Sequence, residues 1–138
     1  MFLLDGFRMI FDIGRVSQRV NIWGGSLNIP QFIGSLIFIT YIEGQLVLVT
    51  VIFTLIVAGQ VHKRSPFSRL IGLCHIPWLP LLPWLVYRIM NFPHPIWLEV
   101  WLYYTAGAIA ISLMFDTRDI YLYSKGQTTF AWASRDGE

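Results

Sequence analysis

The chain has 138 residues, of which 55% are hydrophobic and 13% are charged, and its formal net charge is +2. Soluble domains carry about 25% charged residues, and a chain this small needs polar side chains over its whole surface. The composition therefore excludes a water-soluble globular fold and predicts an all-α integral membrane protein that crosses a lipid bilayer several times. The small net charge gives no reason to expect a nucleic-acid partner.

Residues 1–20 show a helical charge pattern. The charged residues recur at spacings of three and four, which places them on one stripe of a helix; they are Asp5, Arg8, Asp12, Arg15 and Arg19. Leucine, isoleucine and phenylalanine side chains occupy the opposite side. This amphipathic pattern predicts a helix lying in the membrane interface, with packing on a partner protein as the alternative. We expect Gly24-Gly25 to end this helix and Pro30 to begin a new one.

Residues 31–60 are almost wholly apolar, and Glu43 is their only formal charge. Thirty helical residues extend about 45 Å, whereas the hydrocarbon core of a bilayer is about 30 Å thick. The segment is too short for two crossings, so it predicts one long span that ends before Lys63-Arg64.

Residues 70–90 are long enough to span, but they contain Pro77, Pro80 and Pro83. An interior proline removes a helical hydrogen bond and costs about 3 kcal/mol. The segment is therefore predicted to be either a broken span or a re-entrant segment. The spacing of three also suits a polyproline II conformation.

Residues 96–115 predict the last span, followed by a short polar tail over 116–138. Small residues recur within this span at helical spacing, at Ala106, Ala110 and Ser112. Such a face lets a second helix approach closely, so we expect these residues to pack against another helix.

With three spans, the fold gathers Glu43, Glu99, Arg88 and His94 at one side of the membrane. Buried carboxylates there predict either a proton or cation pathway or a structural ion pair, most simply between Glu43 and Arg88. The two termini would then lie on opposite sides. Four lysines and arginines would lie on the side of the N-terminus and six on the side of the tail, a difference that does not decide which side is cytoplasmic.

His75 and His62 are the candidate ligand residues on the other side. Two histidines from neighbouring helices can hold a haem, but His62 adjoins Lys63 at the surface, so we expect no haem. A metal site that uses Cys74 and His75 lacks a nearby glutamate, and we expect none. His75 is instead expected to bond to backbone groups that the prolines leave free.

The sequence contains none of the short motifs of the common hydrolases, metalloproteases or nucleotide-binding enzymes. We therefore expect a small non-catalytic membrane protein that serves as an accessory or assembly subunit of a larger membrane complex. The alternative is a homo-oligomeric channel or proton-coupled transporter that uses Glu43 and Glu99.

Overall fold

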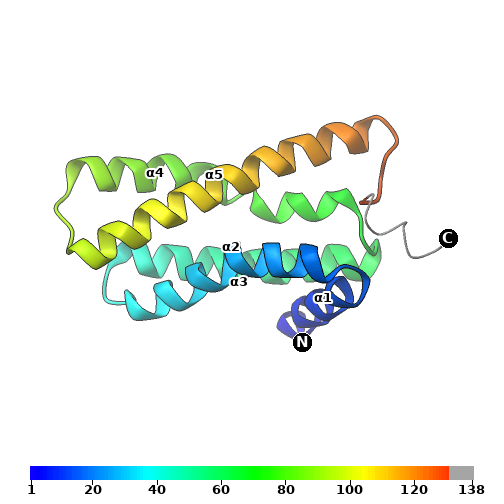
Figure 1. Ribbon diagram of the computed structural model, residues 1–138, viewed down its shortest axis with the longest axis horizontal. Coiled ribbons are helices and arrows are strands. Elements are labelled where there is room, and N and C mark those ends of the chain that lie inside the picture. Colours follow the sequence, from blue (N-terminus) through cyan, green and yellow to red (C-terminus); the bar gives the residue numbers. More distant parts are fainter. Residues whose placement is uncertain (131–138) are drawn as a thin grey trace.

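The computed structural model describes residues 1–130, and within them the chain is helical with no extended strand. Its helices are α1 (Phe2–Val16), α2 (Gln18–Ile37), α3 (Ile42–Arg64), the 3-10 helix η1 (Arg69–His75), α4 (Trp78–Asn91) and α5 (Ile96–Ser124). Four segments run lengthwise, namely α2, α3, η1 with α4, and α5, and α1 lies across one end (Figure 1). The all-α prediction is confirmed. Two helices, α3 and α5, are long and apolar enough to cross a membrane, and η1 with α4 becomes a third candidate if the bent pair is one span.

The first change of direction lies at Ser17 and not at Gly24-Gly25, so the expectation that the glycines end the first helix is wrong. Ser17 has an extended backbone (φ −147°, ψ 102°), and its hydroxyl accepts a hydrogen bond from the Val20 amide at 3.4 Å. Serine at this position caps the first turn of a helix. Pro30 lies inside α2 and not at its start.

The second break divides the expected 31–60 span. Residues 31–37 are the last turns of α2, and after a turn at residues 38–41 the chain reverses into α3. The turn contains neither glycine nor proline, so hydropathy alone could not locate it. Gly44 makes it compact, because a Cβ at Gly44 would lie 2.1 Å from the carbonyl oxygen of Phe38.

The proline-rich segment is bent by 42° between η1 and α4, so it contains a break, as predicted. The break lies before Trp78, however, and the chain is α-helical through Pro80 and Pro83, where an interrupted helix was expected. The polyproline II alternative is wrong, since the backbone is helical on both sides of the bend. Pro77 precedes α4 and Pro80 lies in its first turn, where amides have no helical acceptor. Only Pro83 removes a hydrogen bond from within the helix.

The predicted tail begins too early, because α5 continues past Phe115 to Ser124. Residues 116–124, which carry three charged side chains, stay helical because Asp116 and Asp119 lie at ion-pair distance from side chains of η1. Residues 131–138 of the predicted tail lie outside the described residues.

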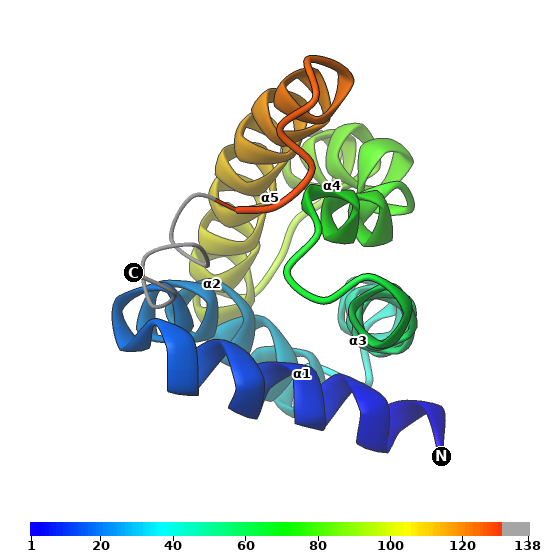
Figure 2. The same cartoon turned by 90° about the vertical axis from the view of Figure 1, so that its right-hand side faces the viewer.

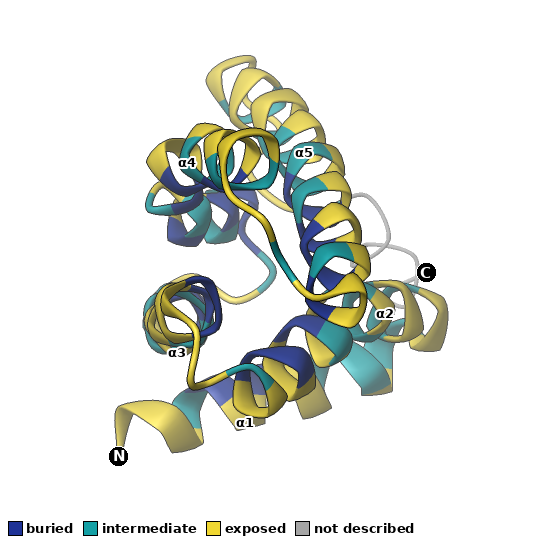
Figure 3. Cartoon of the chain, turned by 90° about the vertical axis from the view of Figure 1, so that its left-hand side faces the viewer, coloured by how far each residue is buried: buried dark blue, intermediate teal, exposed yellow. Residues whose placement is uncertain are grey.

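The larger cluster of buried apolar side chains lies between α3, α4 and α5, and a smaller one joins Met9 of α1, Ala58 of α3 and Cys74 of η1. Val47, Leu85, Leu98 and Leu102 are fully buried in the larger cluster and pack with two tryptophan rings. Buried positions face the interior of the bundle, while exposed positions cover its outside (Figure 3). Large apolar side chains are exposed on every α-helix. An apolar exterior of this extent is typical of helices that contact lipid.

Candidate functional site

Glu43, in the first turn of α3, is the most deeply buried charged residue among those described, with 1% of its surface exposed. Its Oε1 atom lies 2.8 Å from Arg88 Nε and 2.8 Å from His94 Nε2. The prediction that Glu43 is buried and paired with Arg88 is confirmed. We call Glu43, Arg88 and His94 the Glu43 cluster.

Three elements position this cluster. Arg88 lies in the last turn of α4, and its guanidinium carbon lies 4.0 Å from the centre of the Phe92 ring. The chain then leaves the helix, and Pro93 and Pro95 on either side of His94 restrict the turn that carries the imidazole over Glu43. The carboxylate thus joins α3, the end of α4 and the turn into α5.

Glu99 does not join the cluster. It lies in the first turn of α5, it is half-buried, and it forms no ion pair within residues 1–130. Its neighbour Leu98 faces the core instead, together with Leu102. Adjacent helical residues point about 100° apart, which turns Glu99 away from Glu43.

Apolar side chains separate the Glu43 cluster from the middle of the bundle. Val47 lies one turn beyond Glu43 on α3 and is fully buried against Leu85, Leu98 and Leu102. The carboxylate has two cationic or hydrogen-bonding partners on one side and packed apolar side chains on the other. Chemically, this arrangement serves as a clamp between helices.

His75 forms a second charged contact, with a residue of the predicted tail. Its Nδ1 atom lies 2.6 Å from Asp116 Oδ2 on α5. Beside this contact, Arg69 Nη1 lies 2.5 Å from Asp119 Oδ1. The expectation that His75 bonds to backbone groups is therefore wrong. The spacing of three between Asp116 and Asp119 was the available signal, since it places both on one helix face.

His62 faces a different carboxylate. Its Nε2 atom lies 3.2 Å from Asp12 Oδ2 on α1, so His62 and His75 engage separate acids on separate helices. Among residues 1–130, no group of three or more histidine, cysteine or acidic side chains is arranged to hold a metal ion.

The polar stripe of α1 binds the end of α3. Asp5 Oδ2 accepts hydrogen bonds from Gln60 at 2.9 Å and from Lys63 at 3.3 Å. The hydrogen bond from Gln60, with help from Lys63, holds the pKa of Asp5 below its ordinary value. The stripe and the end of α3 together line a shallow polar pocket.

The small residues of α5 have different surroundings. Ser112 lines a narrow cavity together with Asn28, Gln31 and His75, so it faces α2 and η1. Ala106 and Ala110 are half-buried.

Comparison of the chain with protein-family models, with curated proteins and with solved structures finds no match.

Proposed function

We propose that this chain is a small non-catalytic integral membrane protein that acts as an accessory or assembly subunit of a larger membrane complex. The observation that carries the proposal is the Glu43 cluster. Its carboxylate is bound by two partners at 2.8 Å and closed off by packed apolar side chains. A charge enclosed in this way suits the fixing of helices better than the binding and release of a transported species.

The channel or transporter alternative is supported less well. A homo-oligomeric pore would need Glu43 to line a path between copies of the chain, yet this side chain points into its own bundle. Glu99 is half-buried and offers a single carboxylate. We therefore keep the accessory role as the proposal.

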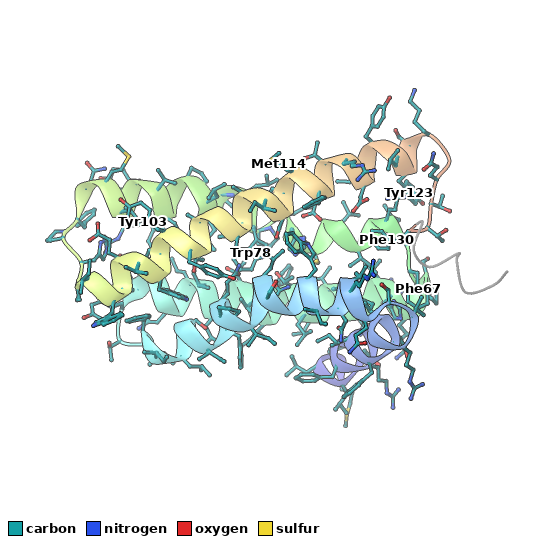
Figure 4. The ribbon with its side chains drawn as sticks, in the orientation of Figure 1. Phe67, Trp78, Tyr103, Met114, Tyr123 and Phe130 are labelled. Atoms are coloured by element: carbon teal, nitrogen blue, oxygen red, sulfur yellow. The ribbon has the colours of Figure 1, made fainter. Side chains whose placement is uncertain are left out.

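The outer face of α5 offers a surface for a partner helix. Tyr103 and Met114 are exposed on this helix (Figure 4), and Gly107 lies between them in the sequence. A Cβ at Gly107 would meet no atom within 4 Å, so the glycine is not required by packing within the chain. A glycine between larger residues allows the backbone of another helix to approach closely.

Substitution at Gly107 tests the proposal. The wild-type chain, extracted from its own membrane in mild detergent, should elute as a complex with a different polypeptide. Gly107→Ala should retain the complex, whereas Gly107→Leu should reduce its recovery at least about fivefold by blocking close approach. Val49→Leu, at an exposed position of α3, is the matched control and should change nothing.

Two results would overturn the proposal. One is a wild-type chain that elutes alone or only with copies of itself. The other is equal recovery of the complex for Gly107→Leu and Val49→Leu.

A further inference from the structure

Helix α2 buries polar side chains and exposes mainly apolar ones. Its exposed polar residues are Gln18 and Arg19 in the first turn, and Ser26 and Asn28, whose side chains bond to carbonyls of their own helix. Gln31 is 3% exposed and Ser35 is fully buried, while Ile22, Ile29 and Ile37 are each more than half exposed. A helix that packs on a protein in water shows the reverse arrangement. The outward face of α2 therefore suits a hydrocarbon environment.

Contacts with α5 show at what depth α2 lies. Trp101 Nε1 donates to the Pro30 carbonyl at 3.1 Å, and further along the two helices the ring centres of Trp23 and Phe115 are 6.1 Å apart. Residue 30 of α2 therefore lies beside residue 101 of α5, and residue 23 lies beside residue 115, so the two helices are antiparallel over this stretch. Residues 101–115 belong to the apolar part of α5, a candidate membrane span. Helix α2 thus lies beside a candidate span along much of its length.

A side chain of α5 also satisfies a backbone carbonyl of α2 that Pro30 leaves without a helical partner. Pro30 has no amide hydrogen, so it leaves the Ser26 carbonyl without its usual partner four residues on. The hydroxyl of Tyr104 donates to this carbonyl. Asn28 and Ser26 in turn donate to carbonyls of their own helix. In lipid, a proline inside a helix is tolerated when a neighbouring helix satisfies the freed carbonyl in this way.

From these observations we infer that the outward face of α2 contacts lipid chains and that α2 is a fourth membrane-crossing segment. Its 20 residues extend about 30 Å, which matches the hydrocarbon thickness of a bilayer. Mean hydropathy misses this helix because it counts interior polar residues such as Gln31 and Ser35, and also Asn28, whose side chain bonds to the backbone of its own helix.

The position of α1 agrees with this placement. Figure 2 looks along the long axis of the bundle, so that α3 is seen end-on and α1 from the side, passing below it. Helix α1 is therefore roughly perpendicular to the bundle, which is the orientation of an interfacial helix. A Cβ at Gly6 would lie 2.7 Å from the Leu55 carbonyl oxygen, while Asp5 binds Gln60 and Lys63, nearer the end of α3. The polar stripe of α1 thus faces the end of the bundle, where the chain would leave the membrane.

The basic residues give an independent argument. Four crossings place the start of α2, the end of α3, the start of η1 and the end of α5 on one side, which we call the α1 side. Eight lysines and arginines of the described residues lie there, namely Arg8, Arg15, Arg19, Lys63, Arg64, Arg69, Arg118 and Lys125. Among residues 1–130, Arg88 is the one lysine or arginine on the opposite side. Since lysine and arginine are enriched on the cytoplasmic side, the α1 side is cytoplasmic.

Single cysteines at exposed positions test the topology. The native Cys74 is buried and supplies the unlabelled baseline, so the full chain can be used with Gln18→Cys, Thr40→Cys, Ser65→Cys or Gln127→Cys. A membrane-impermeant maleimide is added to intact cells and to permeabilised cells. With four crossings, only Thr40→Cys reacts in intact cells, and the other three react after permeabilisation. If Gln18→Cys reacts together with Thr40→Cys, α2 does not cross and the inference is overturned.

A spin label on the outward face of α2 tests the lipid contact directly. In vesicles of defined phospholipid, molecular oxygen should accelerate the relaxation of a spin label at Ile33→Cys, and a water-soluble nickel chelate should not. Val49→Cys on α3 is the lipid reference and Thr40→Cys the aqueous reference. A label at residue 33 that relaxes as the aqueous reference does would overturn the inference. Neither experiment depends on whether the chain has a protein partner.

Discussion

At the scale of single residues, Glu43 is held by two partners of different kinds. Arg88 is charged at every accessible pH, whereas His94 is charged only when it is protonated. Both reach the same carboxylate oxygen at 2.8 Å. The pair with Arg88 is therefore the permanent part of this clamp.

Glu43→Gln should destabilise the chain, because the substitution leaves Arg88 and His94 without an anion. Removing one partner of a fully buried pair costs about 3–5 kcal/mol, but the Arg88 side chain is 23% exposed, so we expect about 2 kcal/mol. Unfolding in mild detergent measures this loss. The double variant Glu43→Gln/Arg88→Met should lose less than the sum of the two single variants. Strict additivity would show that the two residues do not interact.

The contact between Tyr104 and Ser26 yields a second prediction. Tyr104→Phe removes the hydroxyl that satisfies the Ser26 carbonyl, and the loss of one such hydrogen bond costs about 1 kcal/mol. Pro30→Ala restores an amide that can bond to the same carbonyl. In the Pro30→Ala background, Tyr104→Phe should therefore cost clearly less when unfolding is measured under the same conditions. An equal cost in both backgrounds would mean that the hydroxyl does not replace the helical hydrogen bond.

At the scale of helices, the sequence predicts some elements well and others poorly. The apolar runs of α3 and α5 are strong signals, and the prolines mark the bend before α4 because their effect on the backbone is local. The pairing of Glu43 with Arg88 was predictable, since a helix reversal brings the start of one span beside the end of the next.

Other features depend on tertiary contacts. The turn at 38–41 contains no helix-breaking residue, and it forms because α2 folds back along α3 and α5. The continuation of α5 to Ser124 depends on the contacts of Asp116 and Asp119 with side chains of η1. The spacing of Asp116 and Asp119 indicates a shared helix face, but their partners on η1 are distant in sequence, so periodicity could not reveal which side chains they contact.

Helix α1 packs on α3 through two glycines, which gives the next prediction. A Cβ at Gly59 would lie 2.4 Å from the amide nitrogen of Gly6, a clash with backbone that no side-chain rotation relieves. Overpacking costs about 1–3 kcal/mol, so Gly59→Val should expose α1 and speed tryptic cleavage at Arg8 about tenfold or more. Gly107→Val, at a glycine with open space around it, should leave the cleavage rate unchanged.

The pH dependence of α1 docking follows from Asp5. Its pKa is lowered in the folded chain, so its contribution to stability is complete above the unfolded value of about 4. The contribution is lost as the pH falls through the folded pKa. Hydrogen-exchange protection of α1 should therefore exceed that of Asp5→Asn at pH 6, and the difference should vanish in strong acid. A difference that stays constant with pH would exclude the carboxylate as its source.

At the scale of the whole molecule, charged contacts mark both ends of α3. The Glu43 cluster lies at one end, and the contacts of Gln60, His62 and Lys63 with α1 lie at the other. Between them, residues 44–61 of α3 carry no formal charge and extend about 27 Å. In the proposed membrane placement, this length is the hydrocarbon thickness that α3 can match without drawing the charges at its own ends into lipid.

The bundle should therefore be most stable in a bilayer with a hydrocarbon core of about 27 Å, slightly thinner than the average of about 30 Å. Thicker bilayers would draw either the Glu43 cluster or the contacts with α1 into hydrocarbon, where charges are costly. The measurement is the midpoint of thermal unfolding in phosphatidylcholine vesicles of increasing acyl-chain length. We expect a maximum near that thickness and a steady decline in thicker bilayers. In the Asp5→Asn variant, which weakens the attachment of α1, the decline should be less steep. An unfolding midpoint that does not depend on acyl-chain length would mean that these contacts do not set the depth of the bundle.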